Sequence, residues 1–181
     1  MLFRSLAEIV RPTARALMGA GTPYRGVLYV GLIITKDGPK LIEYNIRFGD
    51  PECQVLMPRL KDDLLTLMLA TCDGALATMS VRWNDEAAVA VVLATKGYPG
   101  SYQSGSKIRG ITRASEVEGV KIFQAGTRRE GDKLVAAGGR VLNVTATGKT
   151  VKEAQLRAYK AVDLIDWPEG FCRRDIGWRA V

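Results

Sequence analysis

The stretch that decides the fold runs from position 41 to position 56, Leu41-Ile42-Glu43-Tyr44-Asn45-Ile46-Arg47-Phe48-Gly49-Asp50-Pro51-Glu52-Cys53-Gln54-Val55-Leu56. An apolar run enters it, and acidic, amide, basic, glycine and proline residues then crowd together before apolar sequence resumes. Residues 41–46 follow a Lys36-Asp37-Gly38-Pro39 turn and carry branched apolar side chains, so we predict that they end a strand. Gly49 and Pro51 cannot continue a strand ladder, and the chain must bend there.

Three polar residues of this stretch share one face of the predicted strand. Side chains alternate along a strand, so Glu43 and Asn45 project from the same side. A carboxylate and an amide carbonyl are hard oxygen donors, which suit Mg²⁺, an ion that takes one or two protein ligands besides waters and substrate phosphates. Arg47 continues the face with a planar guanidinium that matches phosphate or carboxylate. The pattern is therefore compatible with a metal and phosphate site.

The same pattern has a plainer interpretation. Glu43, Asn45 and Arg47 would form the solvated face of an ordinary strand end, while Ile42, Tyr44 and Ile46 face the core. The alternation alone favours this interpretation, because any half-buried strand shows it.

Further blocks along the chain carry a resemblance to a known family. The run Arg47–Leu56 resembles the signature of the phosphoribosylamine–glycine ligase (glycinamide ribonucleotide synthetase) family, ATP-grasp enzymes of purine synthesis. Four other blocks are similar to segments of that family and come in its order, at Tyr24–Leu32, Gly97–Tyr102, Gly138–Ala146 and Arg173–Gly177. The resemblance is to the C-terminal portion of much longer proteins, whose N-terminal domain, mobile ATP lid and most of whose nucleotide pocket have no counterpart here.

The resemblance implies an α+β fold in two parts. Residues 1–84 would be the C-terminal part of an ATP-grasp domain, made of antiparallel strands plus helices and carrying the metal site. Residues 85–181 would be the small α+β C-terminal domain of the synthetase. Met1 would then be the start of a truncated or split chain.

The resemblance also implies roles for individual residues. Glu43 and Asn45 would hold the Mg²⁺ (or Mn²⁺) that bridges the phosphates of ATP, and Arg47 would stabilise phosphate charge in the transition state. Asp50 and Arg140 would face the phosphoribosyl substrate, with Arg140 anchoring its phosphate. The implied reaction joins glycine to 5-phosphoribosylamine through glycyl phosphate and yields glycinamide ribonucleotide, ADP and phosphate. The adenine-binding residues are not assigned.

As an enzyme, the chain would work with the missing N-terminal portion supplied as a separate chain, or it would be a fragment of a longer enzyme. Two other functions are consistent with the sequence. The first is that of an inactive fragment or an interaction module that lacks the N-terminal and lid domains. Carboxylase-type ATP-grasp proteins also carry Glu-x-Asn-x-Arg, but the continuation Phe48–Glu52 argues against that substrate class.

Composition excludes several classes of protein. The 181 residues are 47% hydrophobic and 25% charged, as in globular proteins. The net charge of +7 comes from 26 scattered basic residues, densest at Arg128-Arg129 and Arg173-Arg174, so we expect a basic surface and no nucleic-acid partner. Three separated cysteines and no histidine argue against a zinc site, a disulfide framework and histidine-dependent nucleophiles, and favour a reducing cytoplasm. No apolar run reaches membrane-spanning length.

Periodicity predicts the elements before the central stretch. Apolar residues at three- and four-residue spacings predict a helix over about residues 2–20, which Pro12 would kink or break into two. Residues 27–35 and 40–46 are predicted strands of one hairpin, joined by the turn at residues 36–39.

The remainder of the chain is predicted to alternate strands and helices. An apolar stripe predicts a helix from Arg59 to Ala70, with Asp62-Asp63 in the first turn, where the helix dipole favours negative charge. A capping box at Thr150–Glu153 predicts a helix that runs to about Ile165. Strands are predicted at residues 87–95, 120–127, 133–137 and 140–146, with a glycine-rich connecting loop at 97–105.

Overall fold

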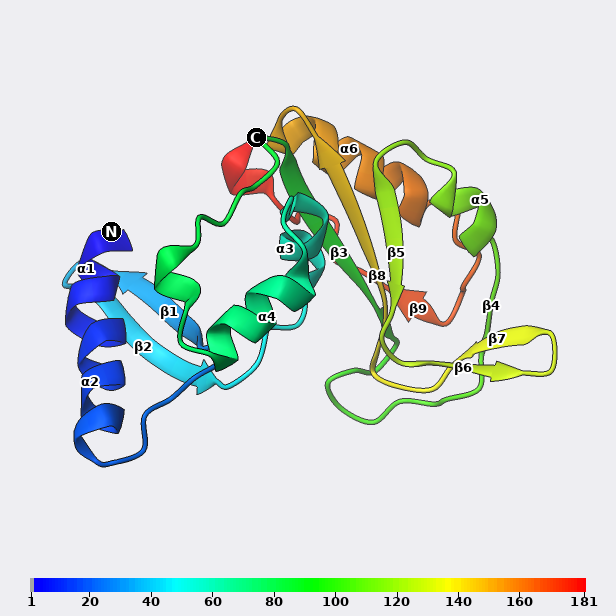
Figure 1. The fold of residues 1–181 in the computed structure, drawn as a ribbon. Coiled ribbons are helices and arrows are strands. Elements are labelled where there is room, and N and C mark those ends of the chain that lie inside the picture. Colours follow the sequence, from blue (N-terminus) through cyan, green and yellow to red (C-terminus); the bar gives the residue numbers. More distant parts are fainter. Residues whose placement is uncertain (1) are drawn as a thin grey trace. The chain divides into compact units, whose positions relative to one another are not determined.

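The computed structural model describes residues 2–181 and shows helices and antiparallel strands (Figure 1). Every strand ladder is antiparallel within the described part of the chain, so the predicted α+β class is confirmed. The chain forms two compact units. The first unit comprises the chain up to Gly49 together with Asp62–Arg82, and the second comprises Asp50–Lys61 together with Trp83–Val181.

The first unit opens with a helical stretch whose hydrogen-bond pattern changes ahead of Pro12. It consists of α1 (Leu2–Ser5), a π-helical segment η1 (Leu6–Val10) and α2 (Arg11–Gly19). Arg11 donates its backbone N–H to the oxygen of Leu6, five residues back. A proline lacks the N–H and crowds the carbonyl four residues earlier, and a wider π-type turn is a known way to accommodate such a defect. Pro12 therefore alters the helix without ending it.

A two-stranded hairpin follows, made of β1 (Tyr29–Thr35) and β2 (Gly38–Asn45). Thr35 pairs directly with Gly38, so the turn consists of Lys36 and Asp37 alone. The Thr35 hydroxyl accepts from the Asp37 N–H and donates to the Gly38 oxygen, which closes the turn. The expectation that Gly38 and Pro39 belong to the turn was wrong, because both begin the second strand.

The helical stretch packs on one side of this hairpin (Figure 1). The hydroxyls of Thr13 and Tyr44 are hydrogen-bonded, which fixes Tyr44 toward the helix. Tyr44 is half-buried, but Ile42 and Ile46 are 65% and 76% exposed. The plainer interpretation of this strand, in which all three side chains face the core, is thus wrong for the two isoleucines.

The predicted helix at 59–70 is replaced by two shorter helices, α3 (Cys53–Arg59) and α4 (Leu64–Cys72), with a 3-10 turn η2 (Leu76–Thr78) behind them. Pro58 lies in the last turn of α3, and Leu60 is extended. Asp63 caps α4 by accepting from the Thr66 N–H at 2.8 Å, as negative charge at a helix start should. Asp62 instead pairs with Arg82, so only one of the two aspartates serves the helix.

The second unit is built on a four-stranded sheet in the order β5-β8-β3-β9. The central strands β3 and β8 pair along their length, and the long helix α6 packs across them. The capping box is confirmed: the Thr150 hydroxyl accepts from the Glu153 N–H, while the Glu153 carboxylate accepts from the Lys149 N–H. The elements are β3 (Ala87–Thr95), β5 (Val120–Gln124), β8 (Arg140–Gly148), α6 (Val151–Val162) and β9 (Gly170–Phe171).

Helices α6 and α3 contact the two central strands from opposite faces (Figure 1). Val91 and Val144 belong to the core cluster that includes the buried alanines of α6. Because side chains alternate along a strand, Asn143 and Thr145 point to the other face, where α3 contacts β3 and β8. Both of these polar residues are buried.

A second, three-stranded sheet has the order β4-β7-β6, with β4 (Lys107–Ile108), β6 (Thr127–Glu130) and β7 (Lys133–Ala136). The predicted strand at 120–127 is divided, because β5 ends at Gln124 and β6 begins at Thr127 in the other sheet. Gly126 lies between them, where an added Cβ would stand 2.5 Å from the Arg140 oxygen. The short helices α5 (Ile111–Ser115) and η3 (Trp178–Ala180) complete the unit, and the predicted loop at 97–105 is confirmed.

Candidate active site

The end of β2 presents a carboxylate and an amide side by side. The Asn45 amide nitrogen donates to a Glu43 carboxylate oxygen at 3.1 Å, so the two side chains share the face that strand alternation predicts. Glu43 is exposed and Asn45 is half-buried. The pair is thus open to a ligand from its own side of the hairpin.

Glycine at position 31 leaves room for the Glu43 side chain. Gly31 pairs with Glu43 across the hairpin, next to an irregularity in the register. A Cβ added at Gly31 would stand 3.0 Å from Glu43 Cγ, tighter than normal packing allows. A side chain at position 31 would therefore require the Glu43 side chain to shift.

The oxygen donors of Glu43 and Asn45 suit Mg²⁺ better than they suit a metal ion whose ligands all come from the protein. Within residues 2–181, no group of three or more His, Cys, Asp or Glu side chains could hold a metal ion. Mg²⁺ does not need such a group, since it retains waters and is completed by substrate phosphates. One carboxylate and one amide oxygen, at Glu43 and Asn45, are a suitable protein contribution.

Arg47 lies just beyond β2 and is exposed. Its Nη1 donates to the Phe48 oxygen at 2.7 Å, and in the part of the chain that the structure describes no carboxylate forms an ion pair with it. A guanidinium has five N–H donors, so most of them stay available. Arg47 can therefore neutralise an anionic group brought to this end of the hairpin.

Asp50 and Arg140 meet within the second unit although they are 90 positions apart in sequence. Arg140 Nη1 donates to the Asp50 main-chain oxygen at 3.0 Å, and Arg140 Nη2 lies 3.3 Å from Asp50 Oδ2. Gln54 Nε2 donates to the other carboxylate oxygen, Oδ1, at 2.9 Å. The structure therefore brings together the two residues assigned to the phosphoribosyl substrate and adds Gln54, which the sequence analysis missed.

The backbone before Arg140 is fixed by its neighbours on β3. The Thr95 N–H donates to the Gly139 oxygen at 2.8 Å, and the Thr95 hydroxyl donates to the Gly138 oxygen at the same distance. The ring of Tyr98 packs on Gly139 so closely that an added Cβ would stand 2.2 Å from the ring. Tyr98 thus helps to place Arg140, a role that the glycine-rich sequence did not reveal.

A cavity of about 220 Å³ lies beside this contact. Its walls are mostly apolar, and two basic residues, Arg140 and Arg173, are among its lining residues. The lining residues are Pro51, Ala90, Val92, Ala94, Tyr98, Arg140, Phe171, Cys172, Arg173 and Ile176.

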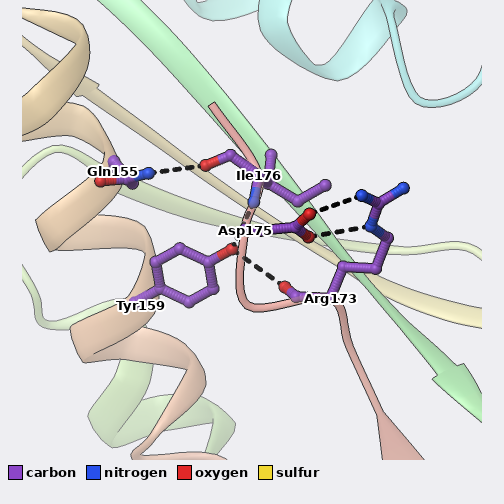
Figure 2. Close-up of polar contacts among 5 residues, drawn as sticks. All are labelled: Gln155, Tyr159, Arg173, Asp175 and Ile176. Atoms are coloured by element: carbon purple, nitrogen blue, oxygen red, sulfur yellow. Dashed lines mark hydrogen bonds and ion pairs between the residues drawn. The ribbon is translucent and has the colours of Figure 1, made fainter. Parts of the chain in front are cut away.

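The segment that carries Arg173 is fastened to α6 (Figure 2). The Tyr159 hydroxyl donates to the Arg173 oxygen at 2.9 Å and accepts from the Ile176 N–H at 3.0 Å, while Gln155 donates to the Ile176 oxygen. Arg173 forms two bonds with the Asp175 carboxylate, and these raise the pKa of the guanidinium and lower that of the carboxyl group. Arg173 therefore stays charged beside the cavity.

Cys53, at the start of α3, lies close enough to Asp50 to be affected by its charge. Burial raises the pKa of its thiol, and the nearby negative charge of Asp50 raises it further. Cys53, Cys72 and Cys172 are free thiols in the structure. Among the described residues, no helix is long and apolar enough to cross a membrane.

Comparison with known proteins gives matches along nearly the whole chain. Residues 2–53 match the model of the phosphoribosylglycinamide synthetase ATP-grasp (A) domain, and residues 88–179 match that of the phosphoribosylglycinamide synthetase C domain. A phosphoribosylamine–glycine ligase of Mesorhizobium japonicum is 63% identical over all 181 residues, and a chloroplastic one of Arabidopsis thaliana is 51% identical over 97% of the chain.

A solved structure shows the same fold. The crystal structure of a phosphoribosylamine–glycine ligase from Thermotoga maritima superposes with a TM-score of 0.80 at 33% identity over 96% of the chain. The chain spans 42% of the length of that protein and of the Mesorhizobium relative, and 34% of the Arabidopsis one. The expectation of an ATP-grasp part followed by a small α+β C-terminal part is therefore confirmed.

Proposed function

The chain belongs to the phosphoribosylglycinamide synthetase family, and we propose that it supplies the C-terminal part of an active site that ligates glycine to 5-phosphoribosylamine. The products would be glycinamide ribonucleotide, ADP and phosphate. The observation that carries the proposal is the Glu43–Asn45 pair at the end of β2, followed at once by the exposed guanidinium of Arg47. We place the chain in the cytoplasm, without a nucleic-acid partner.

Glu43 and Asn45 would hold Mg²⁺, or Mn²⁺, through one carboxylate and one amide oxygen. The metal supplies positive charge to the phosphates of ATP, which lowers the energy of phosphoryl transfer. Arg47 would stabilise the charge that develops on the transferred phosphoryl group. The protein's own contribution is then positioning and charge neutralisation, which needs no histidine.

Asp50 and Arg140 would bind the phosphoribosyl substrate. Their contact uses two of the five N–H donors of Arg140, so the remaining donors can reach a phosphate while Asp50 fixes the guanidinium plane. The carboxylate keeps lone pairs that can accept from ribose hydroxyls.

The remainder of the site would come from the N-terminal portion that the longer relatives possess. Exposed apolar residues of the first unit, among them Phe3, Ile42 and Ile46, favour this view, because such surface is typical of an interface with another part of a protein. A second candidate function, an inactive interaction module, rests on the same exposed residues. Mg·ATP binding distinguishes the two functions.

We also propose that the ATP-grasp part ends near residue 84, as the two family matches at 2–53 and 88–179 suggest.

The decisive experiment titrates the purified chain with Mg·ATP by calorimetry, alone and with the N-terminal portion of the Mesorhizobium relative added as a second chain. We expect ligase activity in the mixture and its loss in Glu43→Gln. Glu8→Gln is the control and should stay active, because it removes a carboxylate of the same unit that forms an ion pair with Arg4. An inactive mixture that binds no Mg·ATP would leave the interaction module as the function.

A further inference from the structure

Asp50 is held from two sides by residues of different segments. Arg140 occupies its main-chain oxygen and Oδ2, and Gln54 occupies Oδ1. We propose that Gln54 is a positioning residue that holds the Asp50 carboxylate in the orientation in which it meets Arg140. This proposal rests on the proposed function only for the identity of the substrate that Asp50 binds.

Spacing and chemistry determine which end of the Gln54 amide faces Asp50. The two residues are four positions apart at the start of α3, where side chains in this spacing are neighbours. An ionised carboxylate can only accept, so the amide nitrogen must face it and the amide oxygen must turn inward. The donor–acceptor distance of 2.9 Å is that of a well-formed bond.

The inward end of Gln54 meets a buried polar environment. Gln54 Oε1 is a buried acceptor without a hydrogen-bond partner among the described residues, and Asn143 Nδ2 is a buried donor in the same situation. Asn143 lies on the sheet face that α3 contacts, and its own oxygen accepts from the Thr145 hydroxyl at 2.7 Å. Both unpartnered atoms are buried, one on helix α3 and the other on strand β8, which α3 contacts, so the amide orientation is determined by the bond to Asp50.

A leucine or methionine at position 54 would preserve most of the packing and remove this restraint. The carboxylate would then be held by Arg140 alone, at a half-exposed contact that solvent competes for. It would rotate away from the start of α3. The neighbouring thiol of Cys53 reports such a movement, because the charge of Asp50 is one of the two influences on it.

The experiment measures the alkylation of Cys53 by iodoacetamide against pH in a chain with Cys72→Ser and Cys172→Ser. Asp50→Asn defines the full effect of the charge. In Gln54→Met we expect the alkylation rate of Cys53 at pH 7 to rise about threefold, because a larger fraction of the thiol is present as thiolate. On a logarithmic scale, this increase should be at least half of the increase caused by Asp50→Asn. Gln124→Met, at the end of β5, also removes an amide hydrogen bond, which joins Gln124 to Thr127, and should leave the rate unchanged.

A Gln54→Met rate equal to that of the unmodified background would overturn the proposal, and so would an Asp50→Asn variant without effect, since Asp50 would not then lie beside Cys53. Gln54→Ala replaces the methionine variant if circular dichroism shows that the latter does not fold. With the N-terminal portion added, Gln54→Met should raise the KM for 5-phosphoribosylamine about tenfold and leave the KM for glycine unchanged. The alkylation result stands even if that mixture proves inactive.

Discussion

Arg140 contacts Asp50 through two different groups, the main-chain oxygen at 3.0 Å and the carboxylate at 3.3 Å. Only a guanidinium has two nitrogen atoms spaced to reach both. The contact joins the central motif, residues 41–56, to a strand residue 90 positions after Asp50, so it brings two distant segments together at a candidate substrate site.

We expect Arg140→Lys to lower the free energy of unfolding by no more than about 1 kcal/mol, because exposed ion pairs contribute little. The two side chains are 40% and 38% exposed. Urea denaturation followed by circular dichroism measures the change. Arg109→Lys, at the more exposed ion pair with Asp166, is the matched control and should change stability less. A loss above about 3 kcal/mol would show that the Asp50 contact behaves as a buried pair.

We expect Gly139→Ala to destabilise the chain by about 1–3 kcal/mol, as overpacking does. The new methyl group would overlap the ring of Tyr98, which must then move away from the Arg140 backbone. Gly19→Ala, where a Cβ meets nothing within 4 Å, is the control and should be neutral or slightly stabilising. The double variant Gly139→Ala, Tyr98→Ser should recover stability relative to the single one. Failure to recover would assign the strain to another neighbour.

We expect Gly31→Ala to weaken Mg·ATP binding about tenfold through displacement of Glu43, whose Cγ would stand 3.0 Å from the new methyl group. Calorimetric titration measures the affinity, and thermal unfolding of the same samples shows whether the fold is kept. An affinity equal to that of the unsubstituted chain would contradict the role of Glu43 as a metal ligand.

Local sequence rules predicted some elements correctly and missed others within the same unit. Strand β3 and helix α6 follow from an unbroken apolar run and from the capping residues at Thr150, which act on their own neighbours. Helix α3 escaped prediction because Gly49 and Pro51 indicate a bend and Pro58 interrupts the helical pattern. The break between β5 and β6 depends on the approach of Gly126 to the Arg140 backbone, a contact that no sequence window contains.

The candidate site divides in the same way. The Glu43–Asn45 pair follows from strand alternation, and Gln54 could have been found from its four-residue distance to Asp50. By contrast, Asp50 and Arg140 were connected only through the family resemblance. No periodicity links positions that lie on a bend and on a distant strand.

Acid should destabilise the first unit partly through Asp63. Hydrogen bonds from the Thr66 N–H and hydroxyl lower the pKa of this carboxyl below its ordinary 3.8 in the folded state. A lowered folded-state pKa means that the stabilisation is complete above the unfolded value and is lost as pH falls through the folded value. Asp63→Asn keeps an acceptor but does not titrate, so we expect it to lose less stability between about pH 4 and pH 2. Thermal unfolding against pH measures this, and parallel curves for the two proteins would contradict it.

The losses of unfolding free energy caused by substituting the buried residues Asn143 and Thr145 should be strongly non-additive. Asn143→Leu leaves the Thr145 hydroxyl buried without its acceptor, and we expect a loss of about 1–3 kcal/mol. The double variant Asn143→Leu, Thr145→Val removes both polar groups and should be close to neutral. A double-mutant cycle in urea gives the coupling energy. Additive losses would mean that the pair is not mutually dependent.

The chain passes from one compact unit to the other after Gly49, after Lys61 and after Arg82. The central motif is therefore shared, with Glu43 and Arg47 in the first unit and Asp50 and Gln54 in the second. A gene exchange between two relatives with one breakpoint after codon 82 would deliver a second unit whose Asp50 and Arg140 have different ancestries. The division of the motif therefore makes such an exchange costly wherever the two relatives differ at position 50 or position 140.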